Sequence, residues 1–298
     1  MLSIFKNKWG LLYLLSLIWG SSFFLMHIGL KKLTAIEVGA FRICCASLFI
    51  ICYGYQSLTK IPRDKYKYIA LSSLLGTFFP VFLFATSLNH INTSLSAIIN
   101  GLTPISTLLV SMLLFKQPFV KQQFIGISLG FIGTFLLIHL GDKSNDKTSI
   151  FYAGLIIIAT LCYAFSANII KNYLSDIPPL SIVTANFVLI FIPSLIILLN
   201  TNFFELTFDP ENLKSLGAII ILGVVATAFA NILFFKLIAI TSAVFSSSVT
   251  YLIPIVASII GVSFLEEKLS FFQIIASCFI FLGIYLSSIR KSNPNHEY

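Results

Sequence analysis

The chain has 298 residues, of which 57% are hydrophobic and only 10% are charged, and its net charge is +8. A soluble domain carries roughly 25% charged residues, so this chain lacks the charge to cover a water-exposed surface, and lipid must be its outer solvent. The excess lysines lie in short loops between apolar runs, which is typical of membrane topology signals and argues against nucleic-acid binding.

The first half of the chain contains five apolar runs of about 20 residues, long enough to cross a ~30 Å hydrocarbon core as helices. We predict spans at 9–30, 36–55, 67–88, 93–115 and 120–140. The first run is too long for the apolar part of a cleavable signal peptide, so we expect it to stay as a span. Arg42 lies well inside the second run. Such a charge is costly in lipid unless it faces a cavity, an acid or backbone carbonyls.

The second half contains five further runs, and the predicted spans are 150–171, 179–200, 215–237, 243–265 and 270–289. All the runs are continuously apolar, which excludes the alternation of a β-barrel. The predicted fold class is therefore an all-α membrane protein with ten transmembrane helices.

An even number of spans places both termini on one side of the membrane. Segments on that side carry about twice as many Lys and Arg residues as the segments on the other side. We therefore expect a multi-pass protein of the cell inner membrane with both termini in the cytoplasm.

An internal repeat relates the two halves. A shift of 150 residues places 71–139 on 221–289 without a gap, and a shift of 144 residues aligns the earlier spans. The informative matches are Thr77 with Thr227, Pro104 with Pro254, Gln123 with Gln273, Gly133 with Gly283, Trp19 with Tyr163, and Arg42 with Asn186. The sequence thus divides into a first five-helix repeat (1–141), a second five-helix repeat (149–291) and a polar C-terminal tail (292–298).

Five spans per repeat is an odd number, so the two copies enter the membrane in opposite senses. Inverted repeats are typical of secondary transporters, in which two similar halves open a central site to one side and then to the other. The repeat therefore predicts a carrier that works by alternating access.

Three motifs resemble the drug/metabolite transporter superfamily, in its EamA-like branch. They are Trp19-Gly20-Ser21-Ser22-Phe23 followed by Arg42, Asn100-Gly101-Leu102-Thr103-Pro104-Ile105, and Leu265-Glu266-Glu267-Lys268-Leu269-Ser270 with Gln273 and Gly283 after it. The resemblance covers nearly the whole chain. It implies ten helices in two inverted halves around a central cavity, and transport of amino acids, other metabolites or drugs.

The candidate substrate-binding residues are polar or aromatic groups inside the spans. They are Trp19, Arg42, Asn100, Thr103, Tyr163, Asn186, Asn231 and Tyr251. A guanidinium binds carboxylate or phosphate by a bidentate contact, although Arg42 can also snorkel outward or tie helices together. The aromatic and amide groups need polar partners, which are either a wet cavity with its solute or a neighbouring helix.

Pro104 and Pro254 each remove a backbone donor, and they are candidate hinges or simple kinks. Gly126, Gly130 and Gly133 form a small-residue face that serves either helix packing or a dimer seam. The protein is expected to be a monomer or a homodimer.

Other function classes lack their signatures. An intramembrane enzyme needs a buried Ser/Lys or acid pair, or an HExxH-type metal motif, and none is present. A channel would show a selectivity loop, and a sensor would carry a soluble output domain. We expect no metal, no cofactor and no enzyme activity. The predicted partners are membrane lipid and a small solute, such as an amino acid or similar zwitterion, with a drug or nucleotide-like metabolite as the alternative.

Overall fold

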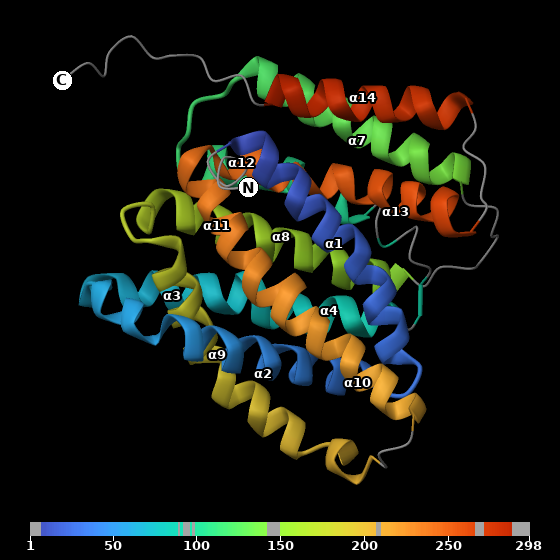
Figure 1. Cartoon of the computed structure of the whole chain (residues 1–298). Coiled ribbons are helices and arrows are strands. Elements are labelled where there is room, and N and C mark those ends of the chain that lie inside the picture. The colour runs from blue at the N-terminus through green and yellow to red at the C-terminus, as the bar shows by residue number, and fades with distance from the viewer. Residues whose placement is uncertain are drawn as a thin grey trace.

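A computed structural model describes residues 7–88, 90–91, 96, 99–141, 150–206, 210–265 and 271–287, leaving aside the side chains of 23, 137–141, 257–258, 260–265 and 273. Within this part of the chain, helix occurs in each of the ten predicted spans and no strand is present (Figure 1). Six of the helical stretches described are long and apolar enough to cross a membrane. The polar tail 292–298 lies outside the described residues.

The first half of the chain forms the helices of the first five spans. They are α1 (Lys8–Leu30), α2 (Ala35–Gly54), the 3-10 turns η2 (Tyr55–Lys60) and η3 (Arg63–Lys65), α3 (Tyr66–Ser73), the π-helical turn η4 (Leu74–Phe78), α4 (Phe79–Leu88), α6 (Thr103–Leu113) and α7 (Lys121–Gly141). A capping box begins α2, in which the side chains of Thr34 and Glu37 each accept the other's backbone N–H. The carboxylate of Glu37 is therefore used as a helix cap.

The second half repeats this pattern. Its helices are α8 (Ile150–Tyr173), α9 (Pro179–Leu199), the 3-10 turn η5 (Asn202–Glu205), α10 (Pro210–Gly223), the π-helical turn η6 (Val224–Phe229), α11 (Ala230–Ile240), α12 (Ala243–Ser247), α13 (Val249–Leu265) and α14 (Phe271–Ser287). The eighth span is longer than predicted, and the ninth is interrupted at Ser248. The two π-helical turns begin 150 residues apart, which is the same shift that aligned the sequence.

The two repeats interleave in space (Figure 1). Helix α1 packs against α10, α11 and α13 of the other repeat, and α8 packs against α3, α4 and α6. We call α1, α10, η6, α11, α12 and α13 unit A, and α8, α3, η4, α4 and α6 unit B. Each unit joins the first span of one repeat to the third and fourth spans of the other. The two units are therefore equivalent when the two repeats are exchanged.

The remaining spans form two pairs, α2 with α9 and α7 with α14. In the second pair, a Cβ added at Gly126 would lie 2.6 Å from both the Gly283 carbonyl oxygen and the Ser287 nitrogen, and a Cβ at Gly133 would lie 2.8 Å from the Ala276 carbonyl oxygen. Small residues thus bring α7 and α14 into backbone contact. The glycine face predicted for the fifth span is used for packing inside the chain.

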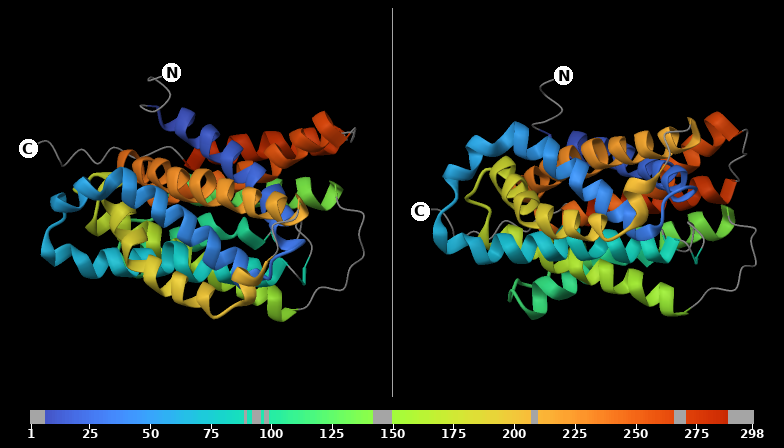
Figure 2. Two further views of the ribbon diagram at one scale, coloured as in Figure 1. Left: turned by 60° about the horizontal axis from the view of Figure 1, so that its bottom comes forward. Right: turned by 90° about the horizontal axis from the view of Figure 1, so that it is seen from below.

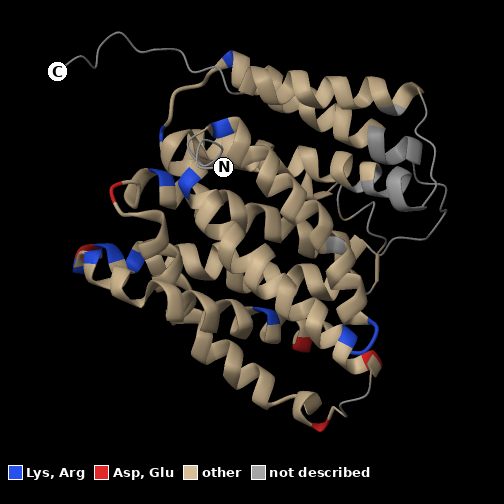
Figure 3. Cartoon of the chain, in the orientation of Figure 1, with Lys and Arg blue, Asp and Glu red and all other residues tan. Residues whose placement is uncertain are grey.

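Helix α1 begins and α14 ends at the same end of the bundle, on the left of Figure 1, and we call this the terminal end. The connection from α2 to α3 also turns there, while the turn from α1 to α2 lies at the opposite end, as the two views in Figure 2 show. Lys and Arg residues gather at the terminal end in Figure 3. The helix ends therefore follow the arrangement expected from an even number of spans.

Candidate functional site

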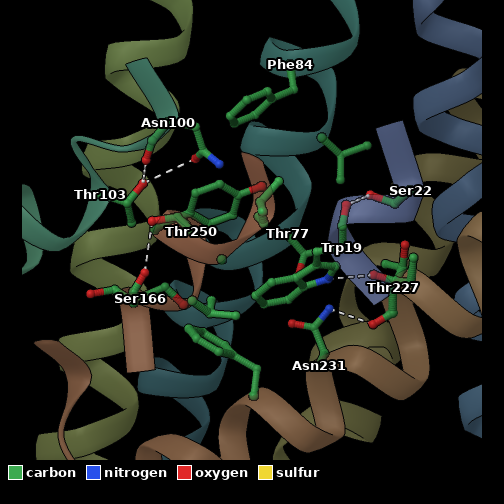
Figure 4. A pocket seen from close by; sticks show the side chains of 18 of the residues that line it. Trp19, Ser22, Thr77, Phe84, Asn100, Thr103, Ser166, Thr227, Asn231 and Thr250 are labelled. Carbon is green, nitrogen blue, oxygen red and sulfur yellow. Dashed lines mark hydrogen bonds between the residues drawn. The ribbon is translucent and has the colours of Figure 1, made fainter. Parts of the chain in front are cut away.

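A cavity lies between unit A and unit B, near the middle of the helices (Figure 4). It encloses about 1060 Å³ of space free of protein atoms, counted out to where it meets solvent. Unit A contributes residues of α1, η6, α11, α12 and α13, and unit B contributes residues of η4, α4, α6 and α8. A central cavity between interleaved halves is where an inverted-repeat carrier holds its solute.

Arg42 supplies the formal charge of this cavity, and it reaches the lining from α2. Its Nε–H donates a 2.6 Å hydrogen bond to Oγ1 of Thr227. The two salt bridges in the described part of the chain lie near helix ends and do not involve Arg42. Among the described residues, the terminal guanidinium nitrogens have no hydrogen-bond partner, so they are available to a solute.

Thr227 is presented by the π-helical turn η6. Its hydroxyl donates a 2.9 Å hydrogen bond to the carbonyl of Leu222, five residues earlier, and its lone pairs remain free to accept from Arg42. Asn231 donates through Nδ2 to the Thr227 carbonyl at 2.7 Å, which leaves its amide oxygen directed away from that bond (Figure 4). Single π-helical turns inside α-helices are frequent at functional sites.

Aromatic rings form much of the wall. Trp19 donates from Nε1 to the carbonyl of Ala226 at 3.0 Å, and its ring centroid lies 5.2 Å from that of Phe234. In unit B, the ring centroids of Phe84 and Tyr163 are 6.1 Å apart. These rings offer faces for stacking or for a cation.

Thr103 is the first residue of α6, and Asn100 lies three residues before it, ahead of the turn that precedes the helix (Figure 4). The Thr103 hydroxyl donates to the backbone carbonyl of Asn100 at 2.7 Å and lies 3.2 Å from its amide oxygen. The Asn100 amide nitrogen then remains as a donor toward the cavity. The two amides, Asn100 and Asn231, thus present a donor and an acceptor.

The lining follows the internal repeat. The sequence shifts of 144 and 150 residues place cavity residues of one unit on cavity residues of the other. These pairs are Trp19 and Tyr163, Ser22 and Ser166, Gly76 and Ala226, Thr77 and Thr227, Phe84 and Phe234, and Asn100 and Thr250. The charge breaks this symmetry, because the equivalent of Arg42 is Asn186, which does not line the cavity.

Six of the eight candidate residues thus line one cavity, and they are Trp19, Arg42, Asn100, Thr103, Tyr163 and Asn231. The structure places Asn186 and Tyr251 elsewhere.

Asn186 is buried between α9 and α3, where its carbonyl accepts from Ser73 at 2.8 Å and its side-chain amide lies 3.1 Å from the Ser72 hydroxyl. Tyr251 is fully buried, and its hydroxyl donates to the carbonyl of Ile127 at 2.8 Å. The polar groups of both residues are hydrogen-bonded to neighbouring helices, which is the alternative to cavity lining that the sequence left open.

The two prolines differ in their surroundings. Pro104 occupies the first turn of α6, directly after a turn in the chain, where its missing N–H removes no helical bond. Pro254 stands inside α13. The sequence placed both in mid-span, but the chain is already broken before Pro104.

No role in the site was predicted from the sequence for Ser22, Ser166, Phe84, Phe234 and Thr250, which also line the cavity, although Ser22 belongs to one of the motifs. Serine and phenylalanine are frequent in this chain, so their type alone carried no signal. The register of the repeat could have found them, since Ser22 falls on Ser166 and Phe84 falls on Phe234. In the part of the chain that the structure describes, no group of three or more His, Cys, Asp or Glu residues could hold a metal ion.

Comparisons with known proteins agree with this architecture. An uncharacterised transporter from Archaeoglobus fulgidus is 25% identical over 295 residues, covering 96% of this chain and 99% of its own length. An S-adenosylmethionine/S-adenosylhomocysteine transporter from Chlamydia muridarum is 24% identical, covering 94% of this chain and 92% of its own length. A solved crystal structure matches with a TM-score of 0.73 at 15% identity, over 93% of this chain and 95% of that one, which shows the same fold.

The profile of the EamA-like transporter family matches residues 8–139 and again residues 150–289. The family and the named relatives are transporters, so the expectation that the protein is not an enzyme is confirmed. The resemblance noted in the sequence motifs and the ten-helix fold of two inverted five-helix repeats are also confirmed. The chain belongs to the EamA-like transporter family of drug/metabolite transporters and is a multi-pass membrane transporter.

Proposed function

We propose that the protein carries an amino acid or a similar zwitterionic metabolite across the membrane by alternating access, and that Arg42 binds the carboxylate of the solute. The observation that supports this proposal is the hydrogen bonding of the Arg42 guanidinium. Its Nε is held by Thr227, and its terminal nitrogens have no partner among the described residues. A charge at this depth is costly unless it is paired, so the solute supplies the counter-charge.

The fork of two terminal nitrogens matches the two oxygens of a carboxylate, and such bidentate pairs are among the strongest hydrogen bonds in proteins. The bond from Nε to Thr227 fixes the orientation of this fork before the solute arrives. Pre-orientation reduces the entropy lost on binding.

The ammonium group of a zwitterion needs acceptors or aromatic faces. The described cavity lining contains no Asp or Glu. The amide oxygen of Asn231 and the rings of Trp19 and Tyr163 are the groups that suit a cation here. A solute whose positive charge is distributed or partly solvated fits this lining better than a dication.

A drug or a nucleotide-like metabolite is the second candidate. The relative from Chlamydia muridarum is named as a transporter of S-adenosylmethionine and S-adenosylhomocysteine. The aromatic wall of the cavity, which includes Phe84 and Phe234, would stack on a planar base. The amino-acid candidate is preferred because the cavity holds one unpaired cation.

We further propose that the protein resides in the cell inner membrane with both termini in the cytoplasm. The support is the concentration of Lys and Arg at the terminal end (Figure 3), which the positive-inside rule assigns to the cytoplasm.

Proteoliposomes containing the purified protein provide the test. Counterflow of radiolabelled amino acids, with S-adenosylmethionine included in the panel, identifies transported solutes. The variant Arg42→Gln should raise the KM for a carboxylated substrate at least tenfold, and Arg63→Gln, which removes an exposed arginine of η3, should leave it unchanged. Saturable transport of a carboxylated substrate with the same KM in Arg42→Gln would remove Arg42 from the site.

A further inference from the structure

One lysine bridges the two units at the terminal end. Lys171 lies near the end of α8 in unit B, and its Nζ donates hydrogen bonds of 3.1 Å to the carbonyl oxygens of Ile238 and of Ala239 in unit A. Both carbonyls belong to the last turn of α11, where no helical N–H remains to bond them. A cation there also faces the negative end of the helix dipole. The contact crosses from one unit to the other, so it must break when the units separate at this end.

The terminal end of the cavity is closed in this structure. Ile238 belongs to the same hydrophobic cluster as Ile170 and Leu174 of unit B. The main contacts that join unit A to unit B among the described residues come from α11 and α12, which both lie at the terminal end. The cavity lining instead extends toward the opposite end, to Met26 of α1 and Phe84 of α4.

The internal repeat assigns an equivalent to this contact at the opposite end. A shift of 144 residues, which superposes Trp19 on Tyr163, also places His27 on Lys171. A shift of 150 residues places Leu88, the last residue of α4, on Ile238. The chain thus carries a second hydrogen-bond donor next to a second helix C-terminus, with the roles of the units exchanged.

His27 is exposed, and it makes no hydrogen bond or ion pair within the described part of the chain. Leu88 packs against the hydrophobic cluster that contains Met26, the neighbour of His27. His27 and the end of α4 thus lie at the same end of the bundle, and His27 forms no hydrogen bond to α4 in this structure. In this structure the contact of Lys171 with the end of α11 is formed, and the equivalent contact of His27 with the end of α4 is not formed.

We propose that Lys171 and His27 are alternating gate residues. Lys171 binds the last carbonyls of α11 while the cavity is closed at the terminal end, and His27 binds the carbonyl of Leu88 when the cavity closes at the opposite end. The two contacts exclude each other, because closing one end of a rocking pair of units opens the other end. This inference rests on the alternating access proposed above, but it requires no assumption about the solute.

The test measures the two ends independently by electron–electron distance spectroscopy on full-length protein in lipid nanodiscs. Spin labels at Leu114 of unit B and Ile240 of unit A report the terminal end, and labels at Ile150 and Leu213 report the opposite end. All four positions are exposed. The labels are placed in a background in which the five native cysteines are replaced and counterflow is retained.

In the variant Lys171→Met, the terminal-end distances should shift to a longer population and the opposite-end distances to a shorter one. The ratio of the two populations should change about tenfold, the loss expected for a charge-assisted hydrogen bond. His27→Ala should shift both ratios in the reverse direction. Lys171→Arg, which retains the charge and the donors, should restore the starting distribution.

Lys65 provides the matched control. It also donates from Nζ to a carbonyl at a helix end, that of Tyr173 at 2.7 Å, but both residues lie on the unit B side of the bundle. Lys65→Met should therefore leave both distance ratios unchanged. Unchanged ratios in Lys171→Met, equal shifts in Lys65→Met and Lys171→Met, or shifts of the same sign in Lys171→Met and His27→Ala would each overturn the proposal.

Failure of this inference is distinct from failure of the proposed function. If Arg42→Gln abolishes tight binding of the solute while Lys171→Met leaves the distances unchanged, the proposed binding site is supported and the assignment of Lys171 as a gate residue is wrong. If the wild-type protein populates a single distance at both ends with and without transported solutes, alternating access itself is wrong.

Discussion

Arg42 and Thr227 lie in different repeats, 185 residues apart, and are joined by a hydrogen bond of 2.6 Å between Nε and Oγ1. The hydroxyl is available because the π-helical turn η6 directs its proton to the carbonyl of Leu222. The equivalent hydroxyl of Thr77 lines the same cavity from η4. Both repeats thus place a threonine hydroxyl at the cavity from a π-helical turn, whereas the charged side chain, Arg42, comes from the first repeat.

Replacing Thr227 by valine should weaken solute binding without unfolding the protein. The substitution preserves the shape of the side chain but removes the acceptor that orients the guanidinium, so the KM should rise about tenfold, in line with the loss of one hydrogen bond to a charged group. Counterflow in proteoliposomes measures this change. Thr77→Val is the matched variant, and an increase in its KM as large as that of Thr227→Val would argue against a specific role for the bond to Arg42.

Asn186 and Asn231 should respond differently to substitution, although both are amides within spans. Asn231→Ala removes a group of the cavity wall, and it should raise the KM severalfold while thermal stability changes little. Asn186→Ala removes the side-chain partner of Ser72 in a buried position, although the Ser72 hydroxyl keeps its hydrogen bond to the carbonyl of Ile69. It should lower the stability by about 0.5–1.5 kcal/mol with an unchanged KM.

Thermal unfolding in detergent and counterflow kinetics, measured on the same preparations, separate the two outcomes. A raised KM in Asn186→Ala at unchanged stability would return Asn186 to the substrate site.

The contrast between these two asparagines illustrates what the sequence could predict. Recurring, continuously apolar runs of about 20 residues identified the spans, because a membrane helix must be apolar over the width of the hydrocarbon core. The odd number of spans per repeat predicted the inversion. Polar residues within spans were correctly expected to avoid lipid, but a single sequence does not show whether such a residue faces a cavity or a neighbouring helix. Asn231 faces the cavity and Asn186 faces a neighbouring helix, and nothing in the sequence indicated this difference.

The interleaving of the two repeats could not be predicted from the sequence either. The contact of α1 with α10, and of α8 with α4, depends on which helices pair across the two halves. The register of the repeat carried more information than residue type, since the shifts of 144 and 150 residues together align most of the cavity lining. Arg42 could be identified because a charge within an apolar run is rare.

Tyr251→Phe should destabilise the protein while leaving transport intact. The hydroxyl donates to the carbonyl of Ile127 at 2.8 Å in a fully buried position outside the cavity lining. Its loss should lower the stability by about 1–2 kcal/mol. The apparent melting temperature in detergent is the measurement, and Tyr13→Phe, at an exposed position of α1, is the control that should melt like the parent protein. A raised KM in Tyr251→Phe would contradict the structural role.

Gly126→Ala should separate α7 from α14 and destabilise the protein strongly. The new methyl group would stand 2.6 Å from the Gly283 carbonyl oxygen and 2.6 Å from the Ser287 nitrogen, and neither backbone atom can move without shifting its helix. Overpacking of this kind costs about 1–3 kcal/mol or more.

Gly154→Ala in α8 is the matched control, because nothing lies within 4 Å of its added Cβ. Alanine has the higher helix propensity by about 1 kcal/mol, so this variant should melt at the same temperature as the parent protein or above it. Equal melting temperatures for Gly126→Ala and Gly154→Ala would mean that α7 and α14 can move apart at little cost, and the close backbone contact between them would then contribute little to stability.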